Sequence, residues 1–421
     1  MFPRALAGLL GAIVLVTVPA FAAGVRVERV TTVAPYPRGL AVVDDAMYVL
    51  CRGRVRGPRE SAPGTGGVSA SVDDQAGTIY VIDPTIAEPI DAPVVSPRVR
   101  TNGRVFARPT APPFRLWDPA SDPPESDRST DRPYCALRFD PATDNFYLCA
   151  FSGVDKPSAP DDRVRFSKNR TDAVLRYDRR TGRWYEVERH APGAPYPDAG
   201  ADHGPPPRGW LEGPDNCLVV ADGLYVVAKD NSRLVRYDLT AVRADPEAGP
   251  PPGEVVLGDR IEIDGLGPRS YTGHSALAVH GDWLYVGYRT SSVIVRVPLD
   301  EHRRIRRPIV GQLVARFDPY DSATGRSANI TDMTFDEQGR LYVVSAQPAR
   351  VYRFTPDPAR VFDARDGAAA PWVDLAVETG NASMKSENVL VHDGWLYVTS
   401  GDGYDYQSGA DGTVYRVRDA S

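Results

Sequence analysis

Residues 284–297, LYVGYRTSSVIVRV, join two short apolar stretches, Leu284–Val286 and Ile294–Val297, through a polar turn. The same arrangement recurs along the chain, with an aromatic residue beside aliphatic ones in the first stretch and, in most copies, an arginine in the second. Short apolar runs bounded by Gly, Asp and Ser are typical of β-strands. The pattern therefore predicts a pair of β-strands that repeats.

Six copies of this pair are visible in the sequence. The first stretches are Met47–Val49, Phe146–Leu148, Leu224–Val226, Leu284–Val286, Leu341–Val343 and Leu396–Val398. The second stretches are Thr78–Val81, Val174–Tyr177, Leu234–Tyr237, Ile294–Val297, Val351–Phe354 and Val414–Val417. A unit of this length cannot bury its own apolar face, so the copies must stack, and all-β units stack as blades around an axis. We therefore predict an all-β fold, a six-bladed β-propeller.

The two ends of the chain indicate how the ring closes. The last copy stops near Val417, one strand short of a four-stranded blade, and an unassigned strand pattern, Val27–Val33, precedes the first copy. Pairing of this N-terminal strand with the last blade would complete that blade and remove two open edges. Although 421 residues would allow two domains, the repeats favour a single domain over residues 23–421.

The N-terminus has the pattern of a secretory signal peptide. Arg4 precedes an apolar run, Ala5–Val18, and small residues follow at Ala20–Ala22. The run is shorter than the ~20 residues of a membrane-spanning helix. We expect a signal peptide at residues 1–22, no membrane span, and a periplasmic or extracellular protein; an uncleaved N-terminal anchor is the alternative.

Bulk composition excludes some partners. A net charge of −6 with 25% charged residues predicts no nucleic-acid-binding surface. The 39 prolines and 37 glycines suit strands and turns and argue against long helices. We expect a monomer.

Long insertions interrupt the repeats, whose first stretches lie 55 to 99 residues apart against ~40–50 for a minimal blade. The insertions lie near Gly53–Ala76, Arg100–Pro133, Gly153–Thr171 and Ser400–Gly412. If each blade runs outward from the axis, all of them fall on one rim of the propeller. This loop-rich face is the expected working surface. There are two alternatives. The insertions could be disordered segments, or they could bind a protein partner in a non-catalytic interaction module.

Cysteines in an exported chain suggest disulfides. Cys51, Cys135, Cys149 and Cys217 allow two bridges in three pairings. Their positions in the repeats place all four on the loop-rich rim. Cys51 and Cys135 come out at matching heights along the axis, as do Cys149 and Cys217, so these are the candidate pairs. The sequence contains no Cys-x-x-Cys signature, so a catalytic or haem-binding role is not predicted.

The first residues of the innermost strands should crowd the axis at the loop-rich end. They include Arg38, Tyr134, Asp215, Asn216, His274, Asp332, Glu387 and Asn388. Buried strands are otherwise apolar, so this polar ring is unusual. The oxygen-bearing residues of the ring form a candidate metal site: Asp215, Asn216, Asp332, Glu387 and Asn388. Calcium takes roughly six to eight oxygen ligands in forgiving geometry; the alternative is a solvated channel in which these groups bond to one another.

Basic residues at the same rim form a candidate ligand-binding set. Arg52, Lys229 and Arg289 end second strands, and with Arg38 they could bind a carboxylate or a phosphate. We place Tyr134 in the same set.

Two residues are candidates for catalysis. His274 lies where a general base could work. Either His274 or Glu387 would activate water for attack on a carbonyl that the cation polarises.

The repeats, with stretches such as Asp336–Val344, resemble the NHL-repeat and gluconolactonase-like superfamily of six-bladed propellers over almost the whole chain. The calcium-dependent lactonases of that superfamily hold a cation on the axis with a Glu, two Asn and an Asp, and an acidic residue assists water attack. In this chain Asn216 begins the segment Asn216–Leu218, which is similar to the Asn-Gly-Leu motif of those lactonases. Asp332 aligns within one residue of the Asp that holds their cation. The axial Glu of those lactonases lies in the first blade, where this chain has Arg38. The axial Glu387 of this chain lies in the last blade. The resemblance implies calcium and the hydrolysis of a lactone or ester.

A second likeness is local. Leu396–Gly403, followed by Gly412–Arg416, is similar to one blade of the soluble quinoprotein sugar dehydrogenases, which bind pyrroloquinoline quinone with calcium. The acids Asp402, Asp405 and Asp411 could hold a cation there, although the glycine-rich composition also suits simple turns.

The leading functional hypothesis is a small-molecule or cation site in an axial pocket, with calcium-assisted lactone or ester hydrolysis as its enzymatic form. A non-catalytic protein-interaction propeller and a sugar dehydrogenase-like oxidoreductase are the alternatives.

Overall fold

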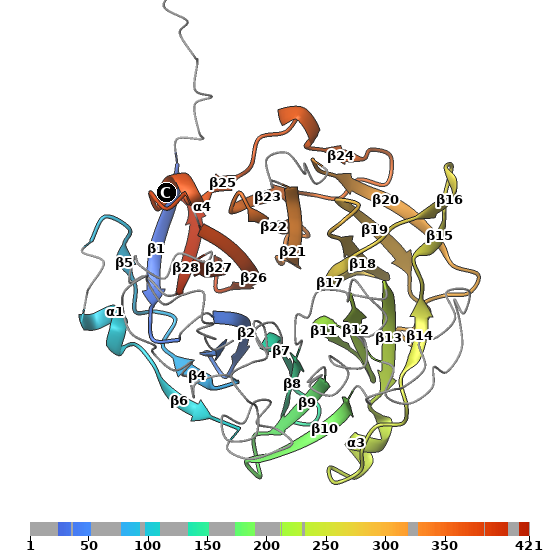
Figure 1. Ribbon diagram of the computed structural model, residues 1–421, viewed down its shortest axis with the longest axis horizontal. Coiled ribbons are helices and arrows are strands. Elements are labelled where there is room, and N and C mark those ends of the chain that lie inside the picture. The colour runs from blue at the N-terminus through green and yellow to red at the C-terminus, as the bar shows by residue number, and fades with distance from the viewer. Residues whose placement is uncertain are drawn as a thin grey trace, which may run out of the picture.

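The chain folds into an all-β propeller, in which sheets surround a central axis (Figure 1). The computed structural model describes residues 24–34, 37–51, 77–92, 97–109, 134–150, 173–189, 211, 213–229, 232–318, 327–382, 384–402 and 412–420. Within these residues the strands pair into six sheets. The predicted all-β propeller class is confirmed, whereas the predicted signal peptide at residues 1–22 lies outside the described residues.

Each sheet begins at the axis and continues outward through four strands (Figure 1). The innermost strands are β2 (Pro37–Val43), β7 (Tyr134–Asp140), β11 (Pro214–Val220), β17 (His274–His280), β21 (Ser327–Phe335) and β26 (Met384–His392). The second strands are β3 (Ala46–Cys51), β8 (Asn145–Ala150), β12 (Gly223–Ala228), β18 (Trp283–Tyr288), β22 (Leu341–Gln347) and β27 (Trp395–Asp402). The third strands are β4 (Ile79–Ile82), β9 (Ala173–Asp178), β13 (Arg233–Asp238), β19 (Val293–Pro298), β23 (Arg350–Phe354) and β28 (Thr413–Asp419). The fourth strands are β6 (Arg104–Ala107), β10 (Arg183–Arg189), β14 (Glu254–Leu257), β20 (Val310–Arg316), β25 (Val373–Asp374) and β1 (Val25–Thr31).

Short additional elements lie at the periphery. They are the strands β5 (Glu88–Pro89), β15 (Arg260–Ile263), β16 (Gly267–Ser270) and β24 (Phe362–Asp363), the helices α1 (Pro97–Thr101), α3 (Thr240–Ala244) and α4 (Leu375–Glu378), and the 3-10 turn η2 (Arg365–Gly367). Strands β15 and β24 each pair in parallel with β20, in the sheet of β17. None of the helices in the described part of the chain has the length and hydrophobicity needed to cross a bilayer.

The first and last strands of the chain share a sheet. β1 runs antiparallel to β28, from the pair Val25–Asp419 to the pair Thr31–Val414. The buried carboxylate of Glu28 accepts a hydrogen bond of 2.7 Å from Nε of Arg416. Burial alone would raise the pKa of Glu28, but its two arginine partners, Arg416 and Arg26, lower it below the ordinary value. This sheet therefore joins residues nearly 400 positions apart.

The aromatic residue of each repeat lies on a second strand, and in most sheets it faces an arginine on the third strand. The directly opposite pairs are Tyr147–Arg176, Tyr225–Arg236, Tyr285–Arg296, Tyr342–Arg353 and Tyr397–Arg416. Cross-strand neighbours of this kind are the unit by which sheets are stabilised. Burial raises the pKa of the Tyr225 phenol to about 12. The repeated pattern in the sequence therefore records cross-strand pairs within each sheet.

Part of one predicted insertion belongs to the sheets. The segment expected to be a long connection from Arg100 contains the fourth strand β6, and Phe106 on this strand packs against Tyr48 with ring centroids 4.9 Å apart. The predicted insertions at 53–76 and 153–171, and most of the one at 400–412, lie outside the described residues.

The structure does not show the predicted disulfides, and all four cysteines are buried. Cys51 packs in the apolar cluster between the first and last sheets, whereas Cys135, Cys149 and Cys217 share a different cluster. The thiol of Cys135 instead donates to the carbonyl of Pro214 at 3.1 Å.

The innermost strands β2 and β7 approach closely at Gly39. A Cβ at this position would lie 2.6 Å from both the Cβ and the backbone nitrogen of Leu137. These atoms belong to a neighbouring strand and cannot move aside as the end of a flexible side chain could.

We predict that Gly39→Ala lowers the free energy of unfolding by about 1–3 kcal/mol through overpacking. Gly249→Ala is the matched control, because a Cβ there meets no atom within 4 Å. Urea denaturation of the two variants and the wild type measures the difference. Equal midpoints for both variants would contradict the close packing of β2 against β7.

Candidate functional site

Every innermost strand has a break in its pairing register near its start. Among the residues without a direct partner on the second strand are Arg38, Ala136, Asp215, Ser275, Thr331 and the pair Glu387–Asn388. A β-bulge of this kind re-aims a side chain relative to the regular alternation. In five of these six described strands the bulge carries polar residues, so the bulges supply the polar lining of the axis.

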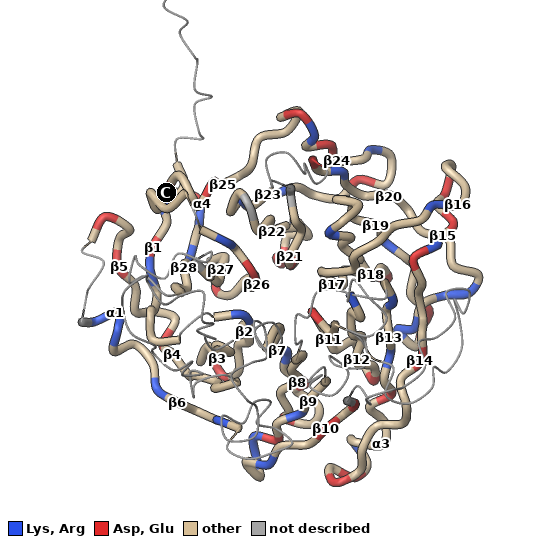
Figure 2. Tube along the Cα trace, viewed as in Figure 1, with Lys and Arg blue, Asp and Glu red and all other residues tan. Residues whose placement is uncertain are grey.

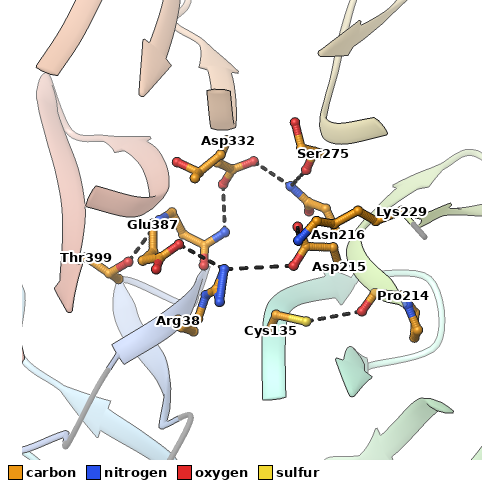
Figure 3. Close-up of polar contacts among 12 residues, drawn as sticks. Arg38, Cys135, Pro214, Asp215, Asn216, Lys229, Ser275, Asp332, Glu387 and Thr399 are labelled. Atoms are coloured by element: carbon orange, nitrogen blue, oxygen red, sulfur yellow. Dashed lines mark hydrogen bonds and ion pairs between the residues drawn. The ribbon is translucent and has the colours of Figure 1, made fainter. Parts of the chain in front are cut away.

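Contacts at the bulges link neighbouring sheets around the axis. They are Cys135 Sγ to Pro214 O (3.1 Å), Asn216 Nδ2 to Ser275 O (3.1 Å), Ser275 Oγ to Ile330 O (2.7 Å) and Thr331 Oγ1 to Ser386 O (3.1 Å). Arg38 and Glu387 form an ion pair of 2.8 Å between the first and last sheets. We call this series the axial belt; Figure 3 shows several of its members.

A single carboxylate lies inside the belt. Asp332 is completely buried, and its two oxygens accept hydrogen bonds from Asn216 Nδ2 (2.9 Å), Asn388 Nδ2 (3.0 Å) and the backbone nitrogen of Val389 (3.1 Å). Arg138 Nη2 lies 3.1 Å from each oxygen and 3.0 Å from Oδ1 of Asn216. We call Arg138, Asn216, Asp332 and Asn388 the inner cluster. Its members come from four different sheets.

Arg138 was not among the residues predicted for the site. It lies on β7 opposite Tyr147. The corresponding positions of the other innermost strands are Ala41, Leu218, Ala278, Thr334 and Leu390. An arginine in the middle of a strand whose equivalents are mostly apolar is the signal that could have found it. Burial alone would lower the pKa of Arg138, but the carboxylate of Asp332 raises it above its ordinary value.

Four charged residues form a second tier, which we call the outer ring: Arg38, Asp215, Lys229 and Glu387. Arg38 bonds Glu387 at 2.8 Å and lies 3.8 Å from Asp215, and Lys229 lies 3.8 Å from the other oxygen of Asp215 (Figure 3). Their side chains are 8–17% exposed. Acidic and basic residues thus lie side by side near the axis (Figure 2). Four of the predicted residues are brought together here.

The other predicted ligand-binding residues are Tyr134, Arg289 and Arg52. Tyr134 is buried in the apolar cluster between the first and second sheets, and its ring covers Gly77. The bulge of β7 lies at Ala136 rather than at Tyr134. Arg289 follows β18 and its backbone N–H donates to Gly273 at 2.6 Å. Arg52 lies outside the described residues.

His274, the predicted general base, is completely buried at the start of β17, where its ring lies 4.5 Å from that of Tyr288. Neither ring nitrogen has a hydrogen-bond partner among the described residues. Burial, with a smaller contribution from Arg233, lowers the pKa of His274 to about 3. The ring is therefore neutral and out of reach of a substrate in the axis, and its placement does not suit proton transfer.

Of the residues predicted to bind a metal, Asp332 and Asn216 direct three oxygens at Nη2 of Arg138, whereas Asp215 and Glu387 direct theirs at Arg38. No group of three or more His, Cys, Asp or Glu side chains in the described part of the chain is arranged to hold a metal ion. Asp332 accepts N–H groups on both oxygens, and Asn216 and Asn388 turn their amide nitrogens toward it. Glu387 and Asp215 face Arg38. The donor set as placed does not fit calcium. Of the alternative acidic loop, Asp405 and Asp411 lie outside the described residues.

Neither a protein-family model nor a curated protein sequence matches the chain. Solved structures do match. A luciferin-regenerating enzyme is 12% identical, with a TM-score of 0.47, over 94% of this chain and 95% of that chain. The PQQ-bound aldose sugar dehydrogenase from Streptomyces coelicolor is 14% identical, with a TM-score of 0.45, over 95% of this chain and 99% of that one. A gluconolactonase from Xanthomonas campestris is 11% identical, with a TM-score of 0.43, over 94% and 89%.

These neighbours include a gluconolactonase and a PQQ-bound aldose sugar dehydrogenase. One fold carries many activities, so likenesses at this level of identity assign no activity to this chain. The fold described above rests on the strand pairings of the chain itself.

We predict that His274 makes the protein less stable in mild acid. Because its pKa in the folded protein, about 3, lies below that of the unfolded chain, the unfolded state binds the proton first. The contribution is complete above about pH 6.5 and stability falls as the pH decreases from there toward 3. His274→Phe should therefore remove about 2 kcal/mol of the loss between about pH 7 and pH 5. Urea denaturation at both pH values measures it.

His302→Gln is the control, since His302 is 73% exposed. An unchanged pH dependence in the His274→Phe variant would show that the histidine is not held neutral.

Proposed function

We propose that this chain is an exported, six-bladed β-propeller of the gluconolactonase-like kind, closed by β1 on the last blade, that binds a small neutral polyhydroxylated molecule at the outer ring. The composition of that ring carries the proposal: two carboxylates and two basic groups, nearly buried, at the end of the axis where the innermost strands begin. The six sheets of the described residues and the pairing of β1 with β28 support the blade count and the closure.

The balance of charge in the outer ring favours hydroxyl groups as ligands. A hydroxyl can donate to a carboxylate and accept from a guanidinium or ammonium group, so one ring of alternating acids and bases can bind several hydroxyls. Arg38 lies between Glu387 and Asp215, and Lys229 lies beside Asp215. The positive groups are thus balanced by negative ones, which gives an anion no general advantage. A sugar or a sugar lactone has the required chemistry, whereas a phosphate or simple carboxylate fits less well.

Hydrolysis of a lactone is the enzymatic form of this proposal. Glu387 is the carboxylate that would accept a proton from water, and its ion pair with Arg38 holds it in place. The basic groups of the ring would stabilise negative charge on the carbonyl oxygen. The oxidoreductase alternative requires a quinone, and its test is sugar oxidation on addition of pyrroloquinoline quinone.

We predict that a neutral sugar or lactone binds and that Glu387→Gln weakens binding about tenfold or more, because a hydrogen bond to a charged acceptor is lost. Calorimetric titration with glucose, glucono-δ-lactone and gluconate measures both. Lactone hydrolysis is followed in the presence of a chelator.

Glu337→Gln is the matched control, since Glu337 is an exposed residue of a hairpin turn. The proposal fails if neither neutral compound binds, or if gluconate alone binds. Equal affinities of the wild type and the Glu387→Gln variant would show that the ligand does not bind at the outer ring.

A further inference from the structure

The centre of the inner cluster is a positive side chain. One nitrogen of Arg138, Nη2, lies 3.0–3.1 Å from three oxygens: both carboxylate oxygens of Asp332 and Oδ1 of Asn216. These oxygens come from two sheets, and the guanidinium comes from a third. Asp and Asn oxygens that converge on one positive group are the arrangement by which proteins also bind hard cations. Here the positive group is covalently part of the chain.

The other groups of the cluster are arranged to suit the arginine. The amide nitrogens of Asn216 and Asn388 and the backbone nitrogen of Val389 complete the hydrogen bonding of Asp332. A second nitrogen of Arg138, Nη1, donates to the carbonyl of Leu137 at 3.1 Å, which holds the guanidinium in place. Because the Asp332 carboxylate is completely buried, it needs a positive partner to be stable in the ionised form.

One oxygen of the cluster is left over. Oδ1 of Asn388 is buried and has no hydrogen-bond partner among the described residues. With Oδ1 of Asn216 and the two oxygens of Asp332 it makes four oxygens within one cluster. A divalent cation in place of the guanidinium could take as ligands the three oxygens that Nη2 contacts, and Oδ1 of Asn388 is a fourth oxygen of the cluster that the guanidinium does not bond.

We propose that Arg138 is the permanent cation of the axial site, that it excludes divalent metal ions from the inner cluster, and that its removal converts the cluster into a calcium site. The inference does not depend on the ligand proposed for the outer ring. It implies that any positive charge needed at the axis is supplied by the chain and not by a metal.

The test is a gain of metal binding. Wild-type protein should show no axial calcium binding up to ~5 mM, above the range of weak extracellular sites. Arg138→Ala removes the guanidinium and leaves the four oxygens, so its melting temperature in chelator should be lower than that of the wild type. Addition of calcium should raise it by roughly 3 °C or more. Calorimetric titration should show one calcium ion per chain that the wild type does not bind.

Two further variants test whether the calcium response arises from the inner cluster. Arg138→Lys keeps a positive charge and should show no calcium response. The double variant Arg138→Ala with Asn388→Ala removes one oxygen and should bind calcium at least about tenfold more weakly than Arg138→Ala. If Arg138→Ala is recovered in soluble form only when calcium is present, that result also supports the inference.

Calcium binding by the wild type that Asn388→Ala abolishes would overturn the inference, as would an Arg138→Ala variant that folds and ignores calcium. These outcomes are separate from those of the sugar titration, because a chain that fails to bind sugars can still gain or fail to gain the metal site.

Discussion

The structure depends on one completely buried carboxylate. Asp332, on the innermost strand β21, accepts hydrogen bonds from β7, β11 and β26, so a single side chain joins four sheets at the axis. An ionised group in such a place costs several kcal/mol of desolvation and is stable only when its lone pairs are all used. Removing one partner of a buried pair typically costs about 3–5 kcal/mol. The arrangement of Arg138, Asn216 and Asn388 follows from that requirement.

The axial belt sets the spacing of the sheets where their innermost strands converge. Strands around the axis of a propeller converge, and their first residues would meet as a crowded set of side chains. A bulge at the start of each innermost strand turns a short polar side chain or a backbone carbonyl toward the next sheet. Hydrogen bonds such as that from Ser275 to Ile330 then hold the sheets at fixed spacing. Where β2 meets β7 the same spacing is set by Gly39, which has no side chain. The outer ring shares the Arg38–Glu387 ion pair with this belt.

The candidate site was predictable in part. Arg38, Asp215, Asn216, Asp332, Glu387 and Asn388 were identified as axial, and all of them lie there. Their predicted role as metal ligands does not agree with the structure, because the nearest hydrogen-bond donor sets the orientation of each carboxylate and amide group. Arg138 is that donor, and it reaches the cluster from a strand position that is apolar in most other sheets. His274 was placed correctly at the start of its strand, but its ring is completely buried against Tyr288, which lies directly opposite on β18.

The sequence by itself determined the strands, their order and the cross-strand pairs of tyrosine with arginine. These features depend on residues close together in the chain, and a repeat shows them several times over. Only the tertiary structure decided which charges meet at the axis and which cysteines stay apart. Those contacts join residues 55 to 349 positions apart, and their geometry depends on bulges that shift a side chain from one face of a strand to the other. A shift of one residue leaves no clear mark in a one-dimensional pattern, yet it determines whether a carboxylate faces a metal ion or a guanidinium.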